Sequence, residues 1–342
     1  PADLHPNIVS RIKIMSGLDI GERRRPQDGR FELPVGGRSF DVRVSILPLN
    51  SSEKIVLRLL DKSSIKVELH ELGFNASQYE LFLKHLNHPH EIILVTGPTG
   101  SGKTTTLYGA LNHINEVSRN IVTVEDPVEY ELAGVNQVQV NVKANLTFSS
   151  ALRSILRQDP DVVMIGEIRD AETAAIAIQA ALTGHMVLST LHTNDAAGAI
   201  TRLVDMAIPP FLIASAVGMV VAQRLVRRLC PDCKESFVVA ESLQQELGLE
   251  VDPERRFFRP VGCVQCDNKG YRGRAAIHEI LAVSKAIEAL VLERAASHVI
   301  ARQAQKEGMI TLRRAGLEKV ESGLTSLEEV LRVSMDSEED EL

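Results

Sequence analysis

Tryptophan is absent from the 342 residues, and phenylalanine and tyrosine together bring the aromatic share to only 4%. This scarcity disfavours the stacking surfaces on which single-stranded nucleic acids are held. Lys and Arg number 38 against 45 Asp and Glu, which gives a formal net charge of −7. The chain therefore lacks the basic excess of a strong nucleic-acid binder, and we expect no nucleic-acid partner. Four cysteines are too few for a disulfide scaffold.

Long apolar runs are also missing. The longest apolar window, Ala207–Ala222, is shorter than the roughly 18 residues of a membrane-spanning helix, and it contains Pro209 and Pro210. We predict a buried helix that begins at these prolines, no transmembrane segment, and a cytoplasmic location. The apolar fraction of 44% is enough to bury sizeable cores, and the length predicts about two or three domains.

The N-terminal region is mostly β in character. Asn7–Met15 predicts a short helix. Phe31–Val35 and Phe40–Ile46 are joined by a Gly-Gly pair, and the second segment alternates strictly between apolar and polar residues, which predicts a hairpin. Ile55–Leu60 predicts a further strand.

From Asn75 onward, short apolar runs alternate with helical patterns. Asn75 can cap a helix that runs to about Asn87. Buried strands are predicted at Glu91–Thr96, Asn120–Glu125, Val162–Ile165 and His185–Ser189. This alternation predicts an α/β fold with a parallel, doubly wound sheet. Beyond Arg274 the pattern predicts helices.

A glycine-rich segment follows the first of these strands and opens a helix. It matches G-x-x-x-x-G-K-[ST] at every fixed position, and its glycines let backbone N–H groups converge on phosphate oxygens. Lys103 would supply a positive charge to the β and γ phosphates, and the Thr104 hydroxyl can ligate Mg²⁺. The predicted nucleotide-binding residues are Gly97, Pro98, Thr99, Gly100, Ser101, Gly102, Lys103, Thr104 and Thr105.

Two further strands end in carboxylates. Glu167 follows Val162–Ile165, and Glu125 ends the strand before it, so both belong to the edge of a parallel sheet where ligands bind. We expect Glu167 to hold Mg²⁺ through its water shell and Glu125 to polarise the attacking water. The alternative for each acid is a helix cap or a solvated strand end.

His185 and His192 flank a strand of the same sheet. A histidine at the phosphate-facing end can sense the γ-phosphate, and His192 is the better candidate because it lies at the C-terminal end. The alternative is a structural histidine.

All four cysteines occur in pairs, Cys230 with Cys233 and Cys263 with Cys266. Two C-x₂-C turns can form the tetrahedral thiolate site that Zn²⁺ prefers, although the 29 residues between the pairs exceed the usual zinc-ribbon spacing. Such a closed site would be structural. Free thiols and disulfides are the alternatives.

The motifs together resemble one family. The segments GPTGSGKTTTLY, TVEDPVEYE, RQDPDVVMIGEIRDAETA and TGHMVLSTLHTNDA, preceded by PQDGRFELPVGGRSFDVRVS, are similar to the secretion-traffic ATPases, the assembly motors of bacterial type II secretion and type IV pili. The resemblance implies a RecA-like P-loop ATPase core that uses ATP and Mg²⁺, a smaller PAS-like domain before it, and a homo-hexamer. It also implies a zinc-binding tetracysteine subdomain and inner-membrane platform and recruiting proteins as partners.

The resemblance also assigns roles. It puts catalysis on Glu125, with Glu129 nearby, and makes Glu167 the Walker B carboxylate. His185 and His192 fall in the family's His box. Two arginines that clamp the γ-phosphate match Arg43 and Arg58.

We therefore predict a partial PAS-like arginine-clamp domain at 1–74, the ATPase core at 75–228, the tetracysteine subdomain at 229–275 and a helical region at 276–342. The expected function is an ATP-driven motor for a type II secretion pseudopilus or a type IV pilus, cytoplasmic and peripheral at the inner membrane. The alternatives are a RecA-like DNA or helicase-type motor and a nucleotide-gated scaffold that does not hydrolyse ATP.

Overall fold

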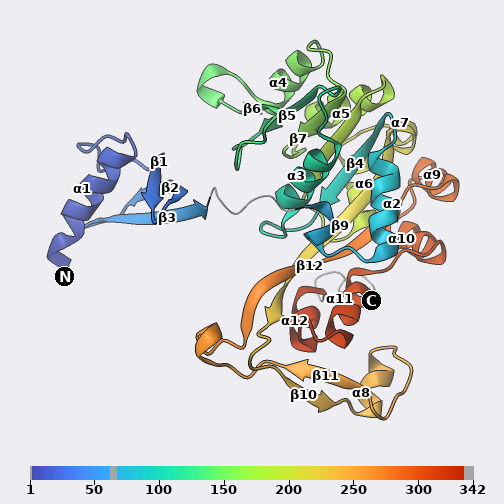
Figure 1. The fold of residues 1–342 in the computed structure, drawn as a ribbon. Coiled ribbons are helices and arrows are strands. Elements are labelled where there is room, and N and C mark those ends of the chain that lie inside the picture. The colour runs from blue at the N-terminus through green and yellow to red at the C-terminus, as the bar shows by residue number, and fades with distance from the viewer. Residues whose placement is uncertain (1, 62–67, 335–342) are drawn as a thin grey trace. The chain divides into compact units, whose positions relative to one another are not determined.

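The computed structural model describes residues 2–61 and 68–334, and the chain divides into two compact units, residues 1–66 and residues 67–342 (Figure 1). In the first unit, helix α1 (His5–Met15) follows a short 3₁₀ turn (Ala2–Leu4). The unit's antiparallel sheet has the order β1-β2-β3. Its strands are β1 (Gln27–Val35), β2 (Arg38–Pro48) and β3 (Glu53–Asp61).

The predicted hairpin is confirmed. Val35 pairs with Arg38, so the two glycines between them form the whole turn, with φ of +59° and +79°. Two-residue hairpin turns of this kind need positive φ at both positions, which glycine adopts without strain. The predicted apolar face is buried at Val42, Val44 and Ile46, where it packs with Ile12 of α1.

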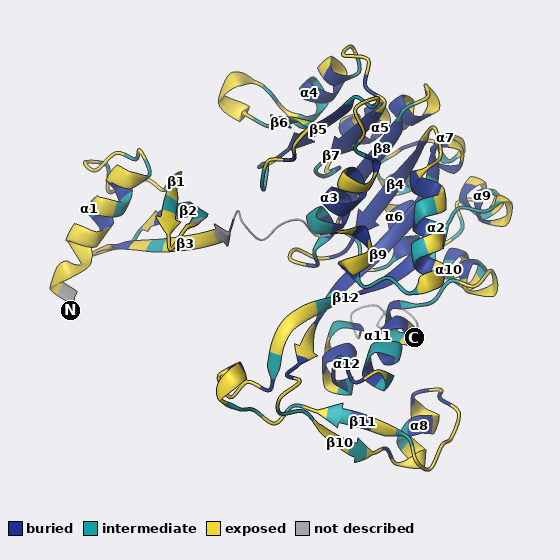
Figure 2. Ribbon diagram, viewed as in Figure 1, coloured by how far each residue is buried: buried dark blue, intermediate teal, exposed yellow. Residues whose placement is uncertain are grey.

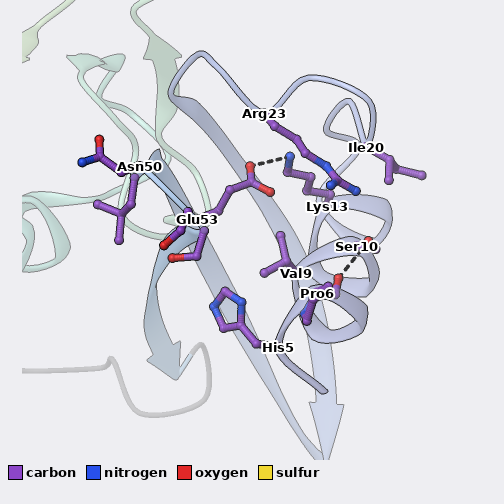
Figure 3. A pocket seen from close by; sticks show the side chains of 12 residues that line it. His5, Pro6, Val9, Ser10, Lys13, Ile20, Arg23, Asn50 and Glu53 are labelled. Carbon is purple, nitrogen blue, oxygen red and sulfur yellow. Dashed lines mark hydrogen bonds and ion pairs between the residues drawn. The ribbon is translucent and has the colours of Figure 1, made fainter. Parts of the chain in front are cut away.

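A cavity of about 650 Å³ opens between α1 and the β2–β3 turn (Figure 3). Lys13 lies beside it, only 1% exposed, with its Nζ 2.7 Å from Oε1 of Glu53 and donating to the carbonyl of Glu22 at 2.6 Å. Removing either charge would leave the other buried without its partner, so this pair fixes α1 on the sheet.

The second unit is built on a seven-stranded sheet in the order β12-β9-β4-β8-β7-β5-β6. All neighbouring strands are parallel except β12, which runs antiparallel to β9. The central strands are buried on both faces (Figure 2). The strands are β4 (Glu91–Thr96), β5 (Ile121–Glu125), β6 (Asn136–Gln139), β7 (Val162–Ile165), β8 (Met186–Leu191), β9 (Val217–Leu229) and β12 (Tyr271–Ala282).

Helices cover both faces of this sheet, which confirms the doubly wound α/β prediction. Ile93 and Val95 of β4 pack with α2 (Ala76–Leu86) and α3 (Lys103–Ile114), whereas Ile92 and Leu94 face the opposite layer. That opposite layer contains α4 (Phe148–Ile155), α5 (Ala171–Leu182), α6 (Ala196–Asp205) and α7 (Pro210–Ala216). Asn75 caps α2 as predicted, accepting from the backbone N–H of Gln78 at 2.9 Å.

The rest of the unit follows β9. A hairpin of β10 (Glu235–Val238) and β11 (Arg256–Arg259) carries α8 (Glu241–Glu246) between its strands. Short 3₁₀ turns lie at Leu69–Leu72, Val142–Ala144 and Val264–Cys266. The last helices are α9 (Lys285–Leu292), α10 (Ser297–Lys306), α11 (Leu312–Glu321) and α12 (Leu327–Ser334). Within the described residues, none of the helices has the length and apolar character needed to cross a membrane.

Two predictions about these elements are wrong. The apolar window Ala207–Ala222 is helical only over Pro210–Ala216, and its second half begins β9. The region beyond Arg274 is not helical at first, because β12 continues to Ala282. Both errors have one cause, because a short buried apolar run is compatible with either a helix or a strand. Here the pairing of β9 with β12, which are far apart in the sequence, makes both segments strands.

Candidate nucleotide-binding site

The glycine-rich loop lies between the C-terminal end of β4 and the first turn of α3. Gly97 has φ of +145°, and a Cβ atom there would lie 2.4 Å from the carbonyl oxygen of Gln223. Gly102 has φ of +89° and is the N-cap of α3. Only glycine fits these two positions, and the open N-terminus of α3 can donate N–H groups to an anion.

Gln223 of β9 holds this loop, although it was not among the residues predicted from the sequence. Its Nε2 donates to the Ser101 carbonyl at 2.8 Å, and its Oε1 accepts from the Thr106 hydroxyl at 2.6 Å. The side chain is buried, with 2% exposed. Gln223 therefore ties the loop to the helix that follows it. The only sequence signal was an amide directly after the apolar window Ala207–Ala222.

Lys103 points back over its own loop. Its Nζ donates to the carbonyls of Gly97 at 2.8 Å and Pro98 at 3.1 Å. Burial lowers the pKa of Lys103 below the usual lysine range, and the Glu167 carboxylate partly offsets that shift. The ammonium group is thus desolvated before any ligand arrives, which strengthens its attraction to a phosphate.

Glu167 and His192 meet at the same edge of the sheet. The Glu167 side chain is 13% exposed; its carboxylate lies 2.5 Å from Nη2 of Arg169 and 3.4 Å from Nε2 of His192. Glu167 and His192 therefore meet at the ends of β7 and β8, and the charge of Glu167 opposes the lowering of the pKa of Lys103 in the loop. Thr104 and Thr105, at the start of α3, are half-buried.

Glu125 ends β5 and is 2% exposed. Its carboxylate accepts from the hydroxyls of Tyr108 and Thr123, the latter at 2.7 Å, and from Nε2 of Gln137 at 3.1 Å. Burial and the charge of Glu125 raise the pKa of Tyr108 above its ordinary value. The Tyr108 oxygen also accepts from the backbone N–H of Glu129 at 3.3 Å, so one tyrosine connects the two acids. Sequence spacing gave no signal for Tyr108.

His185 lies elsewhere. It precedes β8, at the end of the strand where Met186 pairs with Glu91, and the glycine-rich loop follows the other end of β4. Its Nδ1 lies 2.9 Å from the carbonyl oxygen of Ala180. The position of His185 does not support a contact with a phosphate held in the loop of the same chain.

In the first unit, Arg43 and Arg58 occupy one row across the sheet. Arg43 of β2 pairs directly with Arg58 of β3 on one side and with Arg30 of β1 on the other. Arg30 and Arg58 are exposed, and Arg43, with its Nε 3.7 Å from Oδ2 of Asp41, is half-buried. Like charges in register repel, so this row is suited to an anion. Arg30 was not predicted from the sequence, because only the strand register brings it beside Arg43.

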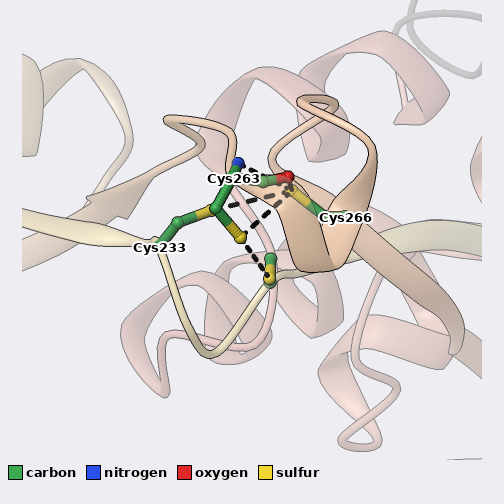
Figure 4. Close-up of side chains that lie close together, drawn as sticks. Cys233, Cys263 and Cys266 are labelled. Atoms are coloured by element: carbon green, nitrogen blue, oxygen red, sulfur yellow. Dashed lines mark hydrogen bonds between the residues drawn. The ribbon is translucent and has the colours of Figure 1, made fainter.

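The four cysteines converge on one point (Figure 4). The Sγ–Sγ separations are 3.9 Å for Cys230 with Cys263, 3.8 Å for Cys233 with Cys266, and 3.7 Å for Cys263 with Cys266. These values exclude disulfides, whose sulfurs are about 2.05 Å apart. They match the roughly 3.8 Å edge of a tetrahedron with Zn–S bonds of about 2.3 Å. The cluster therefore fits zinc.

The fold and this site define a P-loop nucleotide-binding protein with a RecA-like α/β core. A family model described as "Type II/IV secretion system protein" matches residues 1–332. The chain therefore belongs to the type II/IV secretion system protein family.

Named relatives agree with this family. The chain is 54% identical over 327 residues to type II secretion system protein E of Aeromonas hydrophila and 52% identical over 330 residues to type II secretion system ATPase E of Vibrio cholerae. It is 48% identical over 338 residues to the type IV pilus assembly ATPase PilB of Myxococcus xanthus. These matches cover 96%, 96% and 97% of this chain but only 65%, 65% and 59% of the relatives.

Among solved structures, the pilus retraction motor PilT with bound ADP is similar, at 29% identity and a TM-score of 0.67 over 93% of this chain and 80% of that chain. The ATPase DotB of Legionella pneumophila has the same TM-score at 22% identity over 91% of this chain and 78% of that chain. At that identity, the similarity to DotB supports the fold alone.

Proposed function

We propose that the chain hydrolyses ATP and couples hydrolysis to the assembly of a secretion pseudopilus or a type IV pilus. The observation that carries the proposal is the meeting of Glu167 and His192 at the C-terminal edge of the sheet, together with the buried Lys103 in a glycine loop that Gln223 holds in place. The higher identity to type II secretion proteins, 54% and 52% against 48% for the pilus protein, favours the type II branch.

The substrate ATP would place its phosphates on residues 97–105, with Lys103 on the β and γ phosphates. Thr104 and Glu167 would hold Mg²⁺, which when bound neutralises charge on the phosphate oxygens. Glu125, with Glu129 nearby, orients the attacking water, and His192 senses the γ-phosphate. Arg43 and Arg58 close over that phosphate, and its loss releases them, so the first unit moves relative to the second.

The proposal extends to assembly. We propose a homo-hexamer that is cytoplasmic and peripheral at the inner membrane through platform and recruiting proteins. Its parts are a partial PAS-like domain at 1–74, an ATPase core at 75–228, a zinc subdomain at 229–275 and a C-terminal region at 276–342. In the described part of that region, the helices begin at Lys285. His185 takes no part in the proposed site, because it lies at the other end of β8.

Phosphate release by the purified chain tests the function. We expect Mg²⁺-dependent hydrolysis of ATP that added single- or double-stranded DNA does not stimulate. Salt-sensitive stimulation by DNA would favour a helicase-type motor instead. Nucleotide binding without phosphate release would favour a nucleotide-gated scaffold.

Removing either arginine of the clamp is expected to lower turnover by about 100-fold or more, because each would stabilise charge on the transferring phosphoryl group. The variants Arg43→Ala and Arg58→Ala should bind a fluorescent ATP analogue with little change in Kd. Arg58→Ala should not lower the melting temperature much, since it relieves like-charge repulsion along the row, whereas Arg43→Ala also loses the ion pair with Asp41. Arg11→Ala, an exposed arginine of α1, is the control. Unchanged turnover in both variants would remove the clamp from the proposal.

Loss of one cysteine is expected to release zinc and loosen the polypeptide around the cluster. Cys233→Ser should lower tightly bound zinc by one ion per chain, measured by mass spectrometry of the metal, because three ligands hold the ion much more weakly than four. Hydrogen exchange should rise at residues 230–270. Gln265→Ser, an exposed residue inside the second cysteine turn, is the control and should keep the ion. Equal zinc content in the two variants would contradict the assignment.

A further inference from the structure

Two histidines and a glutamate face one another at the end of β4 opposite the glycine loop. Glu91 is the first residue of β4, His85 belongs to the last turn of α2, and His88 lies in the short turn between them. Nδ1 of His85 is 2.8 Å from Oε1 of Glu91, and Nδ1 of His88 is 2.7 Å from Oε2. The three potential ligand atoms all lie within 4.8 Å of one another.

The surrounding backbone fixes the carboxylate. Glu91 and His85 are each 8% exposed. Strand β9 bulges beside them, since Ile92 pairs with Val217 but Ile93 pairs with Met219, which leaves Gly218 as the extra residue. A Cβ atom on Gly218 would lie 2.2 Å from Oε2 of Glu91. The bulge and the missing side chain therefore make room for this carboxylate and hold it in one place.

We propose that His85, His88 and Glu91 form a second metal site, separate from the cysteines, that takes a divalent transition-metal ion, Zn²⁺ above all. Two imidazole nitrogens and one carboxylate oxygen suit zinc, whereas Mg²⁺ and Ca²⁺ prefer oxygen ligands alone. Three protein ligands leave one coordination position for water. The His88 side chain, 42% exposed, leaves the site open to solvent on that side.

Metal binding exchanges one set of contacts for another. Without an ion, each Nδ1 must carry the proton that it shares with the carboxylate. With an ion, both Nδ1 atoms turn their lone pairs to the metal and the proton resides on Nε2. The ion then joins the end of α2 to the start of β4, which the bulge of β9 flanks, so it stabilises the edge of the sheet opposite the nucleotide site.

The test counts zinc ions on the full chain. We expect one ion at the cysteines and a second at this site in the wild type, measured by equilibrium dialysis at micromolar Zn²⁺. His88→Ala should lose the second ion, and Glu91→Gln should raise the Kd for the second ion by about tenfold or more. His90→Ala, an exposed histidine outside the cluster, should keep both ions. In the Cys233→Ser background, added Zn²⁺ should still raise the melting temperature, but not once His88→Ala is also present.

His88→Ala is the deciding variant, because its side chain is exposed and the variant should fold even where Glu91→Gln does not. The proposal is overturned by an equal zinc count in the wild type and His88→Ala. It is also overturned by a second ion that binds only at millimolar Zn²⁺, since both results leave a hydrogen-bonded cluster without a metal.

Discussion

Lys103→Met is expected to lower kcat/KM for ATP hydrolysis by about 1,000-fold, because it removes the one positive charge that the loop itself offers to the phosphates. Lys103 is 9% exposed, and its ammonium group sits against two loop carbonyls. A phosphate oxygen can replace these carbonyls as the acceptor. Methionine keeps the length and the apolar stem of the side chain, so the variant removes the charge and changes the packing little.

Two measurements decide this prediction. Phosphate release gives kcat/KM, and the fluorescence of a labelled ATP analogue gives Kd, which we expect to rise together with the loss of rate. Lys84→Met, an exposed lysine of α2, is the matched control and should match the wild type in both. The free energy of unfolding is measured alongside, because the carbonyls of Gly97 and Pro98 lose a donor. Wild-type turnover by Lys103→Met would remove the glycine loop from the proposed reaction.

The sequence was sufficient where the signal is local. The strand before the loop, the glycines of the loop and the lysine that opens α3 lie within thirteen consecutive residues, Glu91 to Lys103, and the structure has the strand, loop and helix in the expected order. The same holds for the Gly-Gly hairpin and for the cap at Asn75. In each case the residue type fixes a backbone conformation or a nearby hydrogen bond without help from the rest of the chain.

The sequence was insufficient for residues whose contacts lie far away along the chain. Gln223 reaches the loop from a strand that begins 121 residues after β4 ends (Thr96 to Val217), and the apolar window just before it, Ala207–Ala222, was predicted to be helical. Tyr108 meets Glu125 only because α3 packs over β5. Arg30 joins Arg43 through strand register, which a one-residue shift would change. Such contacts depend on the tertiary fold, and periodicity within a segment does not contain them.

Glu125→Gln is expected to bind ATP with a nearly unchanged Kd and to hydrolyse it about 100-fold or more slowly, because an amide cannot polarise the attacking water as a carboxylate can. The structure sharpens this prediction. Both oxygens of Glu125 already accept hydrogen bonds, from Tyr108 on one side and from Thr123 and Gln137 on the other. The carboxylate is therefore held in one orientation, and Tyr108 also contacts the backbone of Glu129.

The variants Tyr108→Phe and Glu129→Gln test whether Glu125 polarises the attacking water itself or only positions Glu129. If Glu125 acts on water directly, Glu125→Gln lowers kcat far more than Glu129→Gln does, and Tyr108→Phe lowers kcat by about tenfold with KM unchanged, since it frees only the orientation of the acid. Tyr130→Phe, whose ring meets that of Tyr108 edge to face at 4.5 Å, is the matched control. A Glu129→Gln variant without turnover beside an active Glu125→Gln variant would move the water-orienting role to Glu129. Glu125 would then be a positioning residue: it holds the Tyr108 hydroxyl, which in turn holds the backbone of Glu129.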